Sequence, residues 1–394
     1  MTTATTTDDS ARLAVLGAGW WSQGWHLPHL DRHPHAVIAA VVEPSASVRS
    51  SLNPHVLQLD ALGARYGART FKTLDELLAA GVPLDGVVVG ASHAAHYELG
   101  RKALEAGLHV FMEKPMTTDP AEARELADAA RRHGKTFMVN NTANWRDATK
   151  LACEWVAGGR IGTVTHVSCY MGSPLLWLFD DPANEGWNRP SGTMLGNGMG
   201  WGQLSHTIAW VLRVTGLEAS TVYCEMSHSD VTGADKYDAA VIRCTNGALI
   251  SVQGVGAVAG ERPAEGGADA RPTGKQIENR IFGTEGFISY GGLDHKPDSG
   301  ALLLRRHDYE CEERSGFLFE DGDQGGIGPA SLQAFVAACR GAEGVWNGCD
   351  AEVGHRVVCI IEAMYRSAAQ GRRVSVVGAE GSDGGGGQSG VVAK

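Results

Sequence analysis

Two hydrophobic periods alternate along the first third of the chain. Between short apolar runs, apolar positions recur at helical spacing, as from Ala94 to Ala106, where Gly107 ends the predicted helix. Asp119-Pro120-Ala121-Glu122 supplies an N-cap, a first-turn proline and a capping carboxylate for a helix running to Gly134. These strand-helix units predict a doubly wound parallel sheet over 11–140, with helices on both faces. Its predicted strands are 12–16, 37–42, 86–89, 108–112 and 136–139.

The rest of the chain, from 141 to 378, has a different pattern. Asn246-Gly247 joins two apolar runs and is typical of a β-hairpin, so antiparallel pairing is expected. Helices are predicted at 329–339 and 351–370. An antiparallel sheet with its helices on one face leaves the other face free for a second subunit, so we expect a homodimer or homotetramer. The clearest strands are 163–171, 220–226, 237–245 and 248–255.

A glycine turn follows the first predicted strand. In Gly17-Ala18-Gly19 the backbone can approach a pyrophosphate, and the next helix directs its free N–H groups at the phosphates. Ser22 stands where the strict fingerprint has a third glycine, and a simple strand-to-helix turn is the alternative interpretation. Glu43 ends the second strand, near the roughly 20-residue spacing expected for a carboxylate that binds the adenosine ribose. Its charge would repel a 2′-phosphate, which favours NAD over NADP, although Arg49 weakens that preference.

A charged pair and a proline, Glu113-Lys114-Pro115, end the fourth strand. The carboxyl ends of the strands face the ligand crevice in a doubly wound sheet, so we expect Lys114 where nicotinamide and substrate meet. A partly desolvated lysine there has a depressed pKa and can exchange a proton with a substrate hydroxyl. The alternative is a surface lysine at the start of a loop.

Composition excludes several classes of partner. The 394 residues are 43% hydrophobic and carry a formal net charge of −11, which disfavours nucleic acids and anionic membranes because both need a basic surface. The first residues lack the features of a signal peptide and no apolar run has membrane-spanning length, so we expect a cytoplasmic protein. The eight cysteines form no C-x-x-C pair, so we expect neither a metal site nor a disulfide framework. Residues 1–10 and the glycine-rich 379–394 are expected to be disordered.

The order of these motifs resembles the Gfo/Idh/MocA oxidoreductases. The likeness runs from residue 12 to about 375 and rests on the turn at 17–19, Ser92-His93-Ala94-Ala95-His96, the segment 103–110 and Glu113-Lys114-Pro115. It implies an α/β protein with an N-terminal Rossmann domain and a C-terminal α/β domain that has a large, mostly antiparallel open sheet. It also implies a nicotinamide cofactor, chemistry at a sugar or cyclitol carbon, Lys114 as the catalytic lysine and a cis bond before Pro115.

One departure from the family concerns an Asp-x-Gly-x-His-x-x-Asp pattern in the second domain. His206 matches the histidine that orients the substrate hydroxyl, but the first acidic position is Gly202, the glycine position is Leu204 and the last acidic position is Ala209. Either Lys114 and His206 share the proton transfer alone, or another group takes the place of the carboxylate. The candidates for that group are Asn197, Gln203 and residues 180–185. The alternative interpretation of His206 is a structural one, in which its side chain caps the start of the helix through a local hydrogen bond.

Aromatic residues favour a carbohydrate substrate. Flat rings suit the C–H faces of sugars, and Trp177, Trp187 and Trp201 lie in predicted loops, although packing explains such tryptophans equally well. The motifs and the resemblance together give two sets of site residues. The expected cofactor contacts are Gly17, Gly19, Trp20, Trp21, Ser22, Glu43, Ser92, His93, His96, Glu113, Lys114 and Asn141. The expected substrate contacts are Trp145, Arg146, Asn197, Trp201, Gln203 and His206.

The resulting hypothesis is hydride transfer between NAD and a secondary alcohol carbon of a sugar, cyclitol or glycoside, with Lys114 and His206 as acid and base. A second hypothesis keeps NAD bound and uses transient oxidation for glycosidic cleavage, elimination or epimerisation. A binding or regulatory protein without turnover is a third, which the intact Glu113-Lys114-Pro115 turn disfavours.

Overall fold

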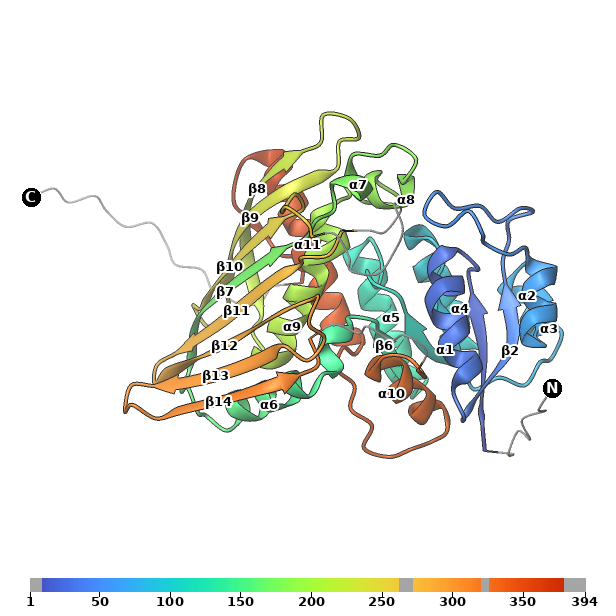
Figure 1. Ribbon diagram of the computed structural model, residues 1–394, viewed down its shortest axis with the longest axis horizontal. Coiled ribbons are helices and arrows are strands. Elements are labelled where there is room, and N and C mark those ends of the chain that lie inside the picture. The colour runs from blue at the N-terminus through green and yellow to red at the C-terminus, as the bar shows by residue number, and fades with distance from the viewer. Residues whose placement is uncertain (1–8, 262–271, 320–325, 379–394) are drawn as a thin grey trace, which may run out of the picture.

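The computed structural model describes residues 9–261, 272–319 and 326–378. The two segments expected to be disordered, 1–10 and 379–394, lie outside these residues except for Asp9 and Ser10. In the described part of the chain, no helix combines the length and the apolarity needed to cross a membrane. Two sheets stand apart with helices between them (Figure 1).

The N-terminal sheet has six parallel strands in the order β3-β2-β1-β4-β5-β6. This confirms the predicted doubly wound domain and adds one strand, β3, which has no buried residue to mark it. The chain order reverses between β1 and its neighbours β2 and β4, which is where such sheets bind ligands. The strands are β1 (Ala11–Leu16), β2 (Ala36–Val42), β3 (Arg69–Phe71), β4 (Gly86–Val89), β5 (His109–Met112) and β6 (Phe137–Val139); the helices are α1 (Leu27–Arg32), α2 (Leu59–Tyr66), α3 (Leu74–Ala79), α4 (His96–Glu105) and α5 (Pro120–Arg132).

The second sheet has nine strands in the order β14-β13-β12-β11-β7-β10-β9-β8-β15. It is mostly antiparallel, as the resemblance implies, but β7 and β10 pair in parallel at its centre. The predicted hairpin joins β9 and β10, and Gly247 takes a positive φ of 87° in its turn. The strands are β7 (Val164–Gly172), β8 (Ala219–His228), β9 (Asp235–Cys244), β10 (Leu249–Val255), β11 (Gln276–Gly283), β12 (Gly286–Leu293), β13 (Gly300–Arg306), β14 (Cys311–Phe317) and β15 (Val374–Ser375).

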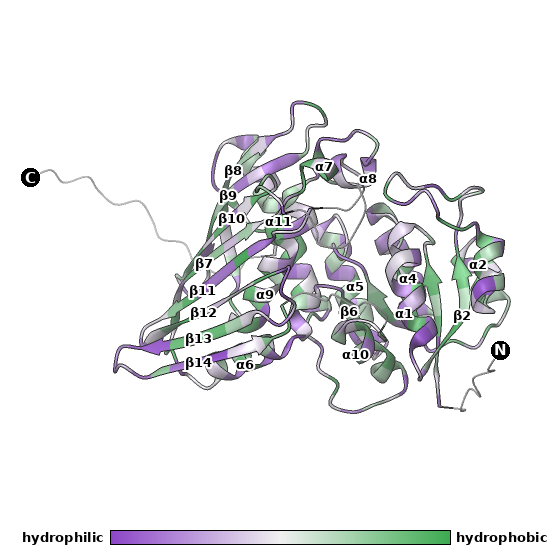
Figure 2. Ribbon diagram, in the orientation of Figure 1, coloured by the Kyte–Doolittle hydropathy of each residue, from purple (hydrophilic) through white to green (hydrophobic). Residues whose placement is uncertain are grey.

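Helices cover one face of this second sheet. The main covering helices are α6 (Asp147–Ala157), α9 (Ser205–Thr215) and α11 (Ala351–Gln370), which pack against β13, β7 and β8 respectively. Two short helices, α7 (Leu176–Phe179) and α8 (Glu185–Asn188), precede a π-helical turn, η4 (Gly200–Leu204). The strands of the parallel sheet are green for most of their length in Figure 2, as expected for a sheet buried on both faces, whereas those of the open sheet mix green, white and purple.

The chain returns once to the N-terminal domain. Helix α10 (Ala330–Cys339) packs against β1 and β5, and the rings of Phe335 and Phe111 lie 5.3 Å apart. Ser331 Oγ donates a 2.8 Å hydrogen bond to Asn140 Oδ1, just beyond β6. The second domain therefore contacts the carboxyl edge of the parallel sheet, where the expected site lies.

Candidate active site

The glycine turn follows β1 and lies against the end of β4. Gly17 has a φ of +91°, and a Cβ there would stand 2.6 Å from Ala91 Cα, so only glycine fits. A Cβ on Gly19 would meet nothing within 4 Å, so this face of the turn is open to a ligand. The side chain of Ser22 is fully buried, and its Oγ lies 2.4 Å from where a Cβ of Gly90 would be. The helix that begins with Ser22 thus packs tightly on β4 although the third glycine of the fingerprint is missing.

Glu43 links the end of β2 to this turn. Its side chain is buried, Oε2 accepts a 2.8 Å hydrogen bond from Ala18 N, and Oε1 accepts one of 2.9 Å from Ser45 N. The carboxylate therefore stands beside the glycine turn, where a ribose would lie. The open face at Gly19 and this carboxylate fit the pyrophosphate and adenosine ribose of a dinucleotide.

Glu113 ties the end of β5 to two other segments, the helical stretch after β1 and the residues just beyond β6. Its Oε1 lies 2.8 Å from Trp21 Nε1, 2.9 Å from His26 Nε2 and 2.8 Å from Asn140 Nδ2. Burial alone would raise the pKa of Glu113, but the hydrogen bonds and charge of His26, with the amide of Asn140 and the charge of Lys114, outweigh it and lower that pKa to about 2. Glu113 is therefore a fixed anion that holds the turn before Lys114.

Lys114 points away from this anchor toward the second domain. Its Nζ donates a 2.6 Å hydrogen bond to the carbonyl oxygen of Gly202, and lies 5.0 Å from the ring centre of Trp187. Burial lowers the pKa of Lys114 to about 8; the charge of Glu113 opposes this shift and that of Lys275 adds to it. Near neutral pH, Lys114 can therefore both give and take a proton.

The turn after Lys114 contains the cis peptide bond that the resemblance implies, between Lys114 and Pro115. His96, fully buried at the start of α4, has Nδ1 2.8 Å from Pro115 O and Nε2 3.2 Å from Ala91 O. The imidazole thus connects the ends of β4 and β5 from behind. Its position is that of a support for the Lys114 turn.

His206 is the second residue of α9, directly after η4. Its side chain is partly exposed and makes no hydrogen bond to the described residues. Burial, followed by the charges of Lys114 and Lys275, lowers its pKa well below the usual range. The imidazole is therefore neutral, and it lies close enough to Lys114 for that charge to act on it. The backbone carbonyl of Gly202, rather than a carboxylate, stands beside the lysine.

A cap formed by residues 173–198 covers the space beside Lys114. Its Trp187 packs edge-on against Trp20, with ring centres 6.4 Å apart, and against His93, at 6.2 Å. On the dinucleotide side, Ser51 Oγ donates a 2.8 Å hydrogen bond to Asn184 Oδ1 of the cap. Burial lowers the pKa of His93 to about 3, so this ring is neutral as well. The cap therefore connects the two domains across the lysine.

Several of the expected substrate contacts are buried behind the site. Trp145 is 2% exposed and donates to the carbonyl of Trp346, and Trp201 is 1% exposed and stacks on Tyr365. Asn197 donates to two carbonyls of the cap, those of Gly186 and Arg189. These three side chains support the walls of the site in this structure. Arg146 and Asn141 are buried too, the first with its guanidinium 5.9 Å from the Phe319 ring centre and the second with Nδ2 3.5 Å from Cys349 Sγ.

Two other expected residues remain accessible. Ser92 is exposed before η2 (His93–Ala95), and Gln203 is partly exposed within η4. His26, Asn140 and the Gly202 carbonyl were not among the expected site residues, and Trp187 was expected only as one of three loop tryptophans suited to a sugar. Of these, only Trp187 had a recognisable pattern, as an aromatic residue in a predicted loop. The others depend on contacts between segments distant in sequence.

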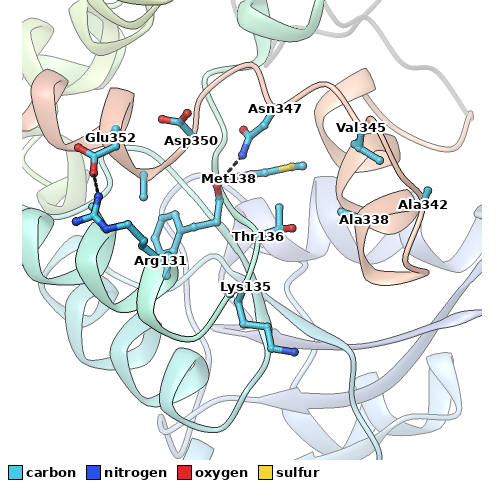
Figure 3. Close-up of a pocket in the computed structure, with 15 residues that line it drawn as sticks. Arg131, Lys135, Thr136, Met138, Ala338, Ala342, Val345, Asn347, Asp350 and Glu352 are labelled. Carbon is cyan, nitrogen blue, oxygen red and sulfur yellow. Dashed lines mark hydrogen bonds and ion pairs between the residues drawn. The ribbon is translucent and has the colours of Figure 1, made fainter.

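The described structure also contains a cavity of about 520 Å³ at the opposite edge of the sheet, beside the amino-terminal end of β6. Figure 3 shows Arg131, one of the charged residues that line it, paired with Glu352, and Asn347 donating to the backbone of Phe137. Because parallel strands share one carboxyl edge, this cavity is separate from Lys114.

Comparisons with known proteins identify the family and agree with the fold. A family model described as "Oxidoreductase family, NAD-binding Rossmann fold" matches residues 11–141, and a "GFO/IDH/MocA C-terminal domain" model matches residues 149–289. Together the two models cover more than half of the chain.

Similar curated proteins include D-glucoside 3-dehydrogenase of Escherichia coli, 29% identical over 40% of this chain and 42% of that enzyme. An uncharacterized oxidoreductase of Schizosaccharomyces pombe is 32% identical over 50% of each chain. The matched part thus spans about half the length of these two relatives. The rhizopine catabolism protein MocA of Rhizobium meliloti is 24% identical over 77% of this chain and 84% of its own.

Solved structures share the fold. Aldose-aldose oxidoreductase from Caulobacter crescentus, crystallised with glycerol, superposes with a TM-score of 0.66 at 19% identity, covering 93% of this chain and 99% of that one. The WlbA dehydrogenase from Bordetella pertussis, in complex with NADH and UDP-GlcNAcA, gives a TM-score of 0.66 at 20% identity, covering 93% and 98%.

Proposed function

The chain belongs to the Gfo/Idh/MocA oxidoreductase family, and on that premise we propose that it transfers a hydride between NAD and a secondary alcohol carbon of a sugar, cyclitol or glycoside. The observation that carries this proposal is the position of Lys114, whose ammonium lies between the Gly202 carbonyl and the Trp187 ring. Its pKa of about 8 suits a group that must exchange a proton with an alcohol near neutral pH.

The residues that would hold NAD lie along the carboxyl edge of the parallel sheet. The Gly17-Ala18-Gly19 turn would receive the pyrophosphate, and Glu43 the adenosine ribose. The buried anion at Glu43 disfavours a 2′-phosphate, which supports NAD rather than NADP. When bound, the cofactor supplies the hydride acceptor or donor, and the protein supplies geometry and electrostatics.

Two residues that can be uncharged near neutral pH, Lys114 and His206, would handle the substrate proton. In the oxidation direction, the deprotonated amine of Lys114 takes the hydroxyl proton, and His206 orients that hydroxyl through a ring nitrogen. In the reverse direction, the ammonium returns the proton to the carbonyl oxygen. The fixed anion of Glu113, at the root of the turn, favours the ammonium form and limits how far burial lowers its pKa.

The aromatic wall supports a carbohydrate-like substrate. Trp187 presents ring surface beside Lys114 and Trp20 packs edge-on against Trp187, and aromatic faces bind the C–H faces of sugar rings. The relatives point the same way, since they include a protein named as a glucoside dehydrogenase and one named as an aldose oxidoreductase.

A second candidate function is transient oxidation by NAD that stays bound, leading to glycosidic cleavage, elimination or epimerisation. The cap favours it, because the hydrogen bond between Ser51 and Asn184 connects the two domains across the dinucleotide side of the site. Such a connection would slow cofactor release.

One experiment separates the two candidates. The purified protein is incubated with NAD and a panel of sugars, cyclitols and glycosides, while nicotinamide absorbance and organic product are followed in the same vessels. NADH formed in equal amount with an oxidised product supports the dehydrogenase. Organic product formed without NADH contradicts the dehydrogenase and supports transient oxidation by NAD that stays bound.

A further inference from the structure

The glycine-rich segment from Gly196 to Gly202, just before His206, packs closely against Asp235 and Tyr365. A Cβ on Gly196 would lie 2.7 Å from Tyr365 Cε1, and one on Gly198 would lie 2.4 Å from the Asp235 carbonyl oxygen. One on Gly200 would lie 2.9 Å from Tyr365 Oη, whereas one on Gly202 would meet nothing within 4 Å. The first three glycines thus allow Asp235 and Tyr365 to press against the segment that forms η4.

A β-bulge directs two aspartates to this place. Ser227 of β8 pairs with Tyr237, but the next residue, His228, pairs with Asp235, so one residue of β9 is left over. The irregularity turns both Asp235 and Asp238 to the inner face of the sheet. Their side chains are 0% and 4% exposed, respectively.

The two carboxyl groups differ in their partners. Asp235 Oδ1 accepts a 2.6 Å hydrogen bond from Tyr365 Oη, and Oδ2 accepts one of 2.7 Å from Gly200 N. Both oxygens of Asp238 are buried without a hydrogen-bond donor in the described structure. Within the described ranges, no Lys, Arg or His side chain pairs with either carboxyl group.

Among the residues that the structure describes, the titratable groups around Asp235 and Asp238 carry no positive charge that could balance two carboxylates. Burial raises the pKa of Asp238 well above its usual range, and the charge of Asp235 and a hydrogen bond with it add to the shift. Tyr365 of α11 has a raised pKa, from burial first and then from the two aspartates, and so does the thiol of Cys224 on β8. Both groups therefore stay neutral, and two adjacent buried carboxylates cannot both ionise.

We infer that Asp235 and Asp238 share one proton, and that this acid pair positions η4 for the reaction at Lys114. The proton resides on Asp238 and is donated to Asp235, whose carboxylate then receives three donors: Asp238, Tyr365 and Gly200 N. Gly200 begins η4, the Gly202 carbonyl accepts from Lys114 Nζ, and His206 follows. Asp235 is thus a positioning residue, a role that rests on the proposed function of Lys114.

The shared proton is tested without substrate. Infrared spectra of the full-length protein near pH 7 are compared for the wild type, Asp238→Asn and Asp235→Asn. A carbonyl stretch of a protonated carboxylic acid is expected in the wild type, absent in Asp238→Asn and retained in Asp235→Asn. No such band, or one that Asp238→Asn leaves in place, overturns the shared proton.

The positioning role is tested by turnover on a substrate of the wild-type protein, with Asp230→Asn, at an exposed position beyond β8, as the matched control. Asp235→Asn is expected to lower kcat about tenfold or more, because a displacement near 1 Å can cost up to about a hundredfold. Its Kd for NAD should change less than about twofold, since the dinucleotide edge is untouched. Asp238→Asn should lose less, because its amide can donate to Asp235.

The outcomes separate this inference from the proposed function. An Asp235→Asn protein that melts earlier but keeps its kcat and pH profile overturns the positioning role. A wild-type protein that shows the infrared band but turns over no substrate overturns the proposed function, while the shared proton of Asp235 and Asp238 is still supported.

Discussion

Glu113 and Lys114 are neighbours in sequence whose side chains meet opposite surroundings. Burial would raise the pKa of the carboxylate, but hydrogen bonds from His26 and Asn140 and the charges of His26 and Lys114 lower it to about 2. The ammonium meets one carbonyl and an aromatic face, and burial lowers its pKa to about 8. Two adjacent groups with separated pKa values indicate separate tasks. Glu113 holds the turn, and Lys114 is free to exchange a proton.

The pH dependence of turnover follows from Lys114. Alcohol oxidation needs the neutral amine, so kcat/KM should rise as pH increases through about 8 and then reach a plateau. Carbonyl reduction needs the ammonium and should fall over the same range. The check is to measure kcat/KM against pH in both directions. Profiles that are flat between pH 7 and 9, or of the reverse sign, contradict a proton-transfer role for Lys114.

Trp187 should matter for substrate binding more than for folding. Trp187→Ala is expected to raise KM for the sugar about tenfold, because an aromatic contact of this kind is worth roughly 0.5–1.5 kcal/mol. Trp187→Phe keeps a ring beside Lys114 and should retain most of the affinity. Steady-state kinetics, with melting temperatures as a check on folding, measure both. If KM is unchanged in Trp187→Ala, the Trp187 ring does not contact the substrate.

Local patterns predicted single residues only where the chemistry is local. The glycine turn, Glu43 and Lys114 each follow a strand, so the sequence places them at one edge of the sheet, and the structure has them there; their roles remain predictions. Trp145 and Trp201 lie in the core because packing between distant segments decides burial. No sequence pattern indicates that a backbone carbonyl, that of Gly202, accepts from the lysine.

Among the helices and strands, those with strong periodicity were predicted best. The predicted helix over 351–370 agrees with α11, and the five expected strands of the first sheet are present. Strand β3 was missed because it is short and only partly buried. The parallel pairing of β7 with β10 joins segments far apart in sequence, so it leaves no local pattern.

The junction of β1, β2 and the glycine turn should set the choice of cofactor. Glu43→Gln can still accept from Ala18 N, but it removes the charge that opposes a 2′-phosphate. We expect the ratio of the NADP and NAD dissociation constants to fall about tenfold, equivalent to roughly 1.4 kcal/mol. Binding titrations of both cofactors measure this ratio.

Glu154→Gln, at an exposed position on α6, is the matched control for that substitution. A ratio that stays at the wild-type value in Glu43→Gln would place the ribose elsewhere.

In the described part of the molecule, the outer face of the nine-stranded sheet carries no helix. Helices pack on the inner face of the nine-stranded sheet, while Tyr223, Tyr237 and Val241 are exposed on its outer face, with Tyr223 directly opposite Val241. An uncovered outer face was expected, because the sequence pattern indicated an antiparallel sheet with its helices on one face. The return of α10 to the first domain was not predictable, because it depends on the tertiary contact between Phe335 and Phe111.

This outer face should form the interface of a homo-oligomer. Val241→Lys introduces a charge among apolar side chains and should shift the protein toward monomer at micromolar concentration. Val231→Lys, in the exposed turn before β9, should leave the mass unchanged. Light scattering coupled to size-exclusion chromatography measures the masses. A wild-type protein that is already monomeric contradicts the prediction.

The most direct test of the proposed mechanism compares NADH formation by the wild type and Lys114→Ala on the first substrate that the panel identifies. Lys150→Ala, at a partly exposed lysine of α6 that pairs with Asp147, is the control. Loss of the general base should lower kcat by about 10²–10⁴-fold at every pH, while NAD still binds and Lys150→Ala retains full activity. Turnover by Lys114→Ala at the wild-type rate would contradict the central role of this lysine.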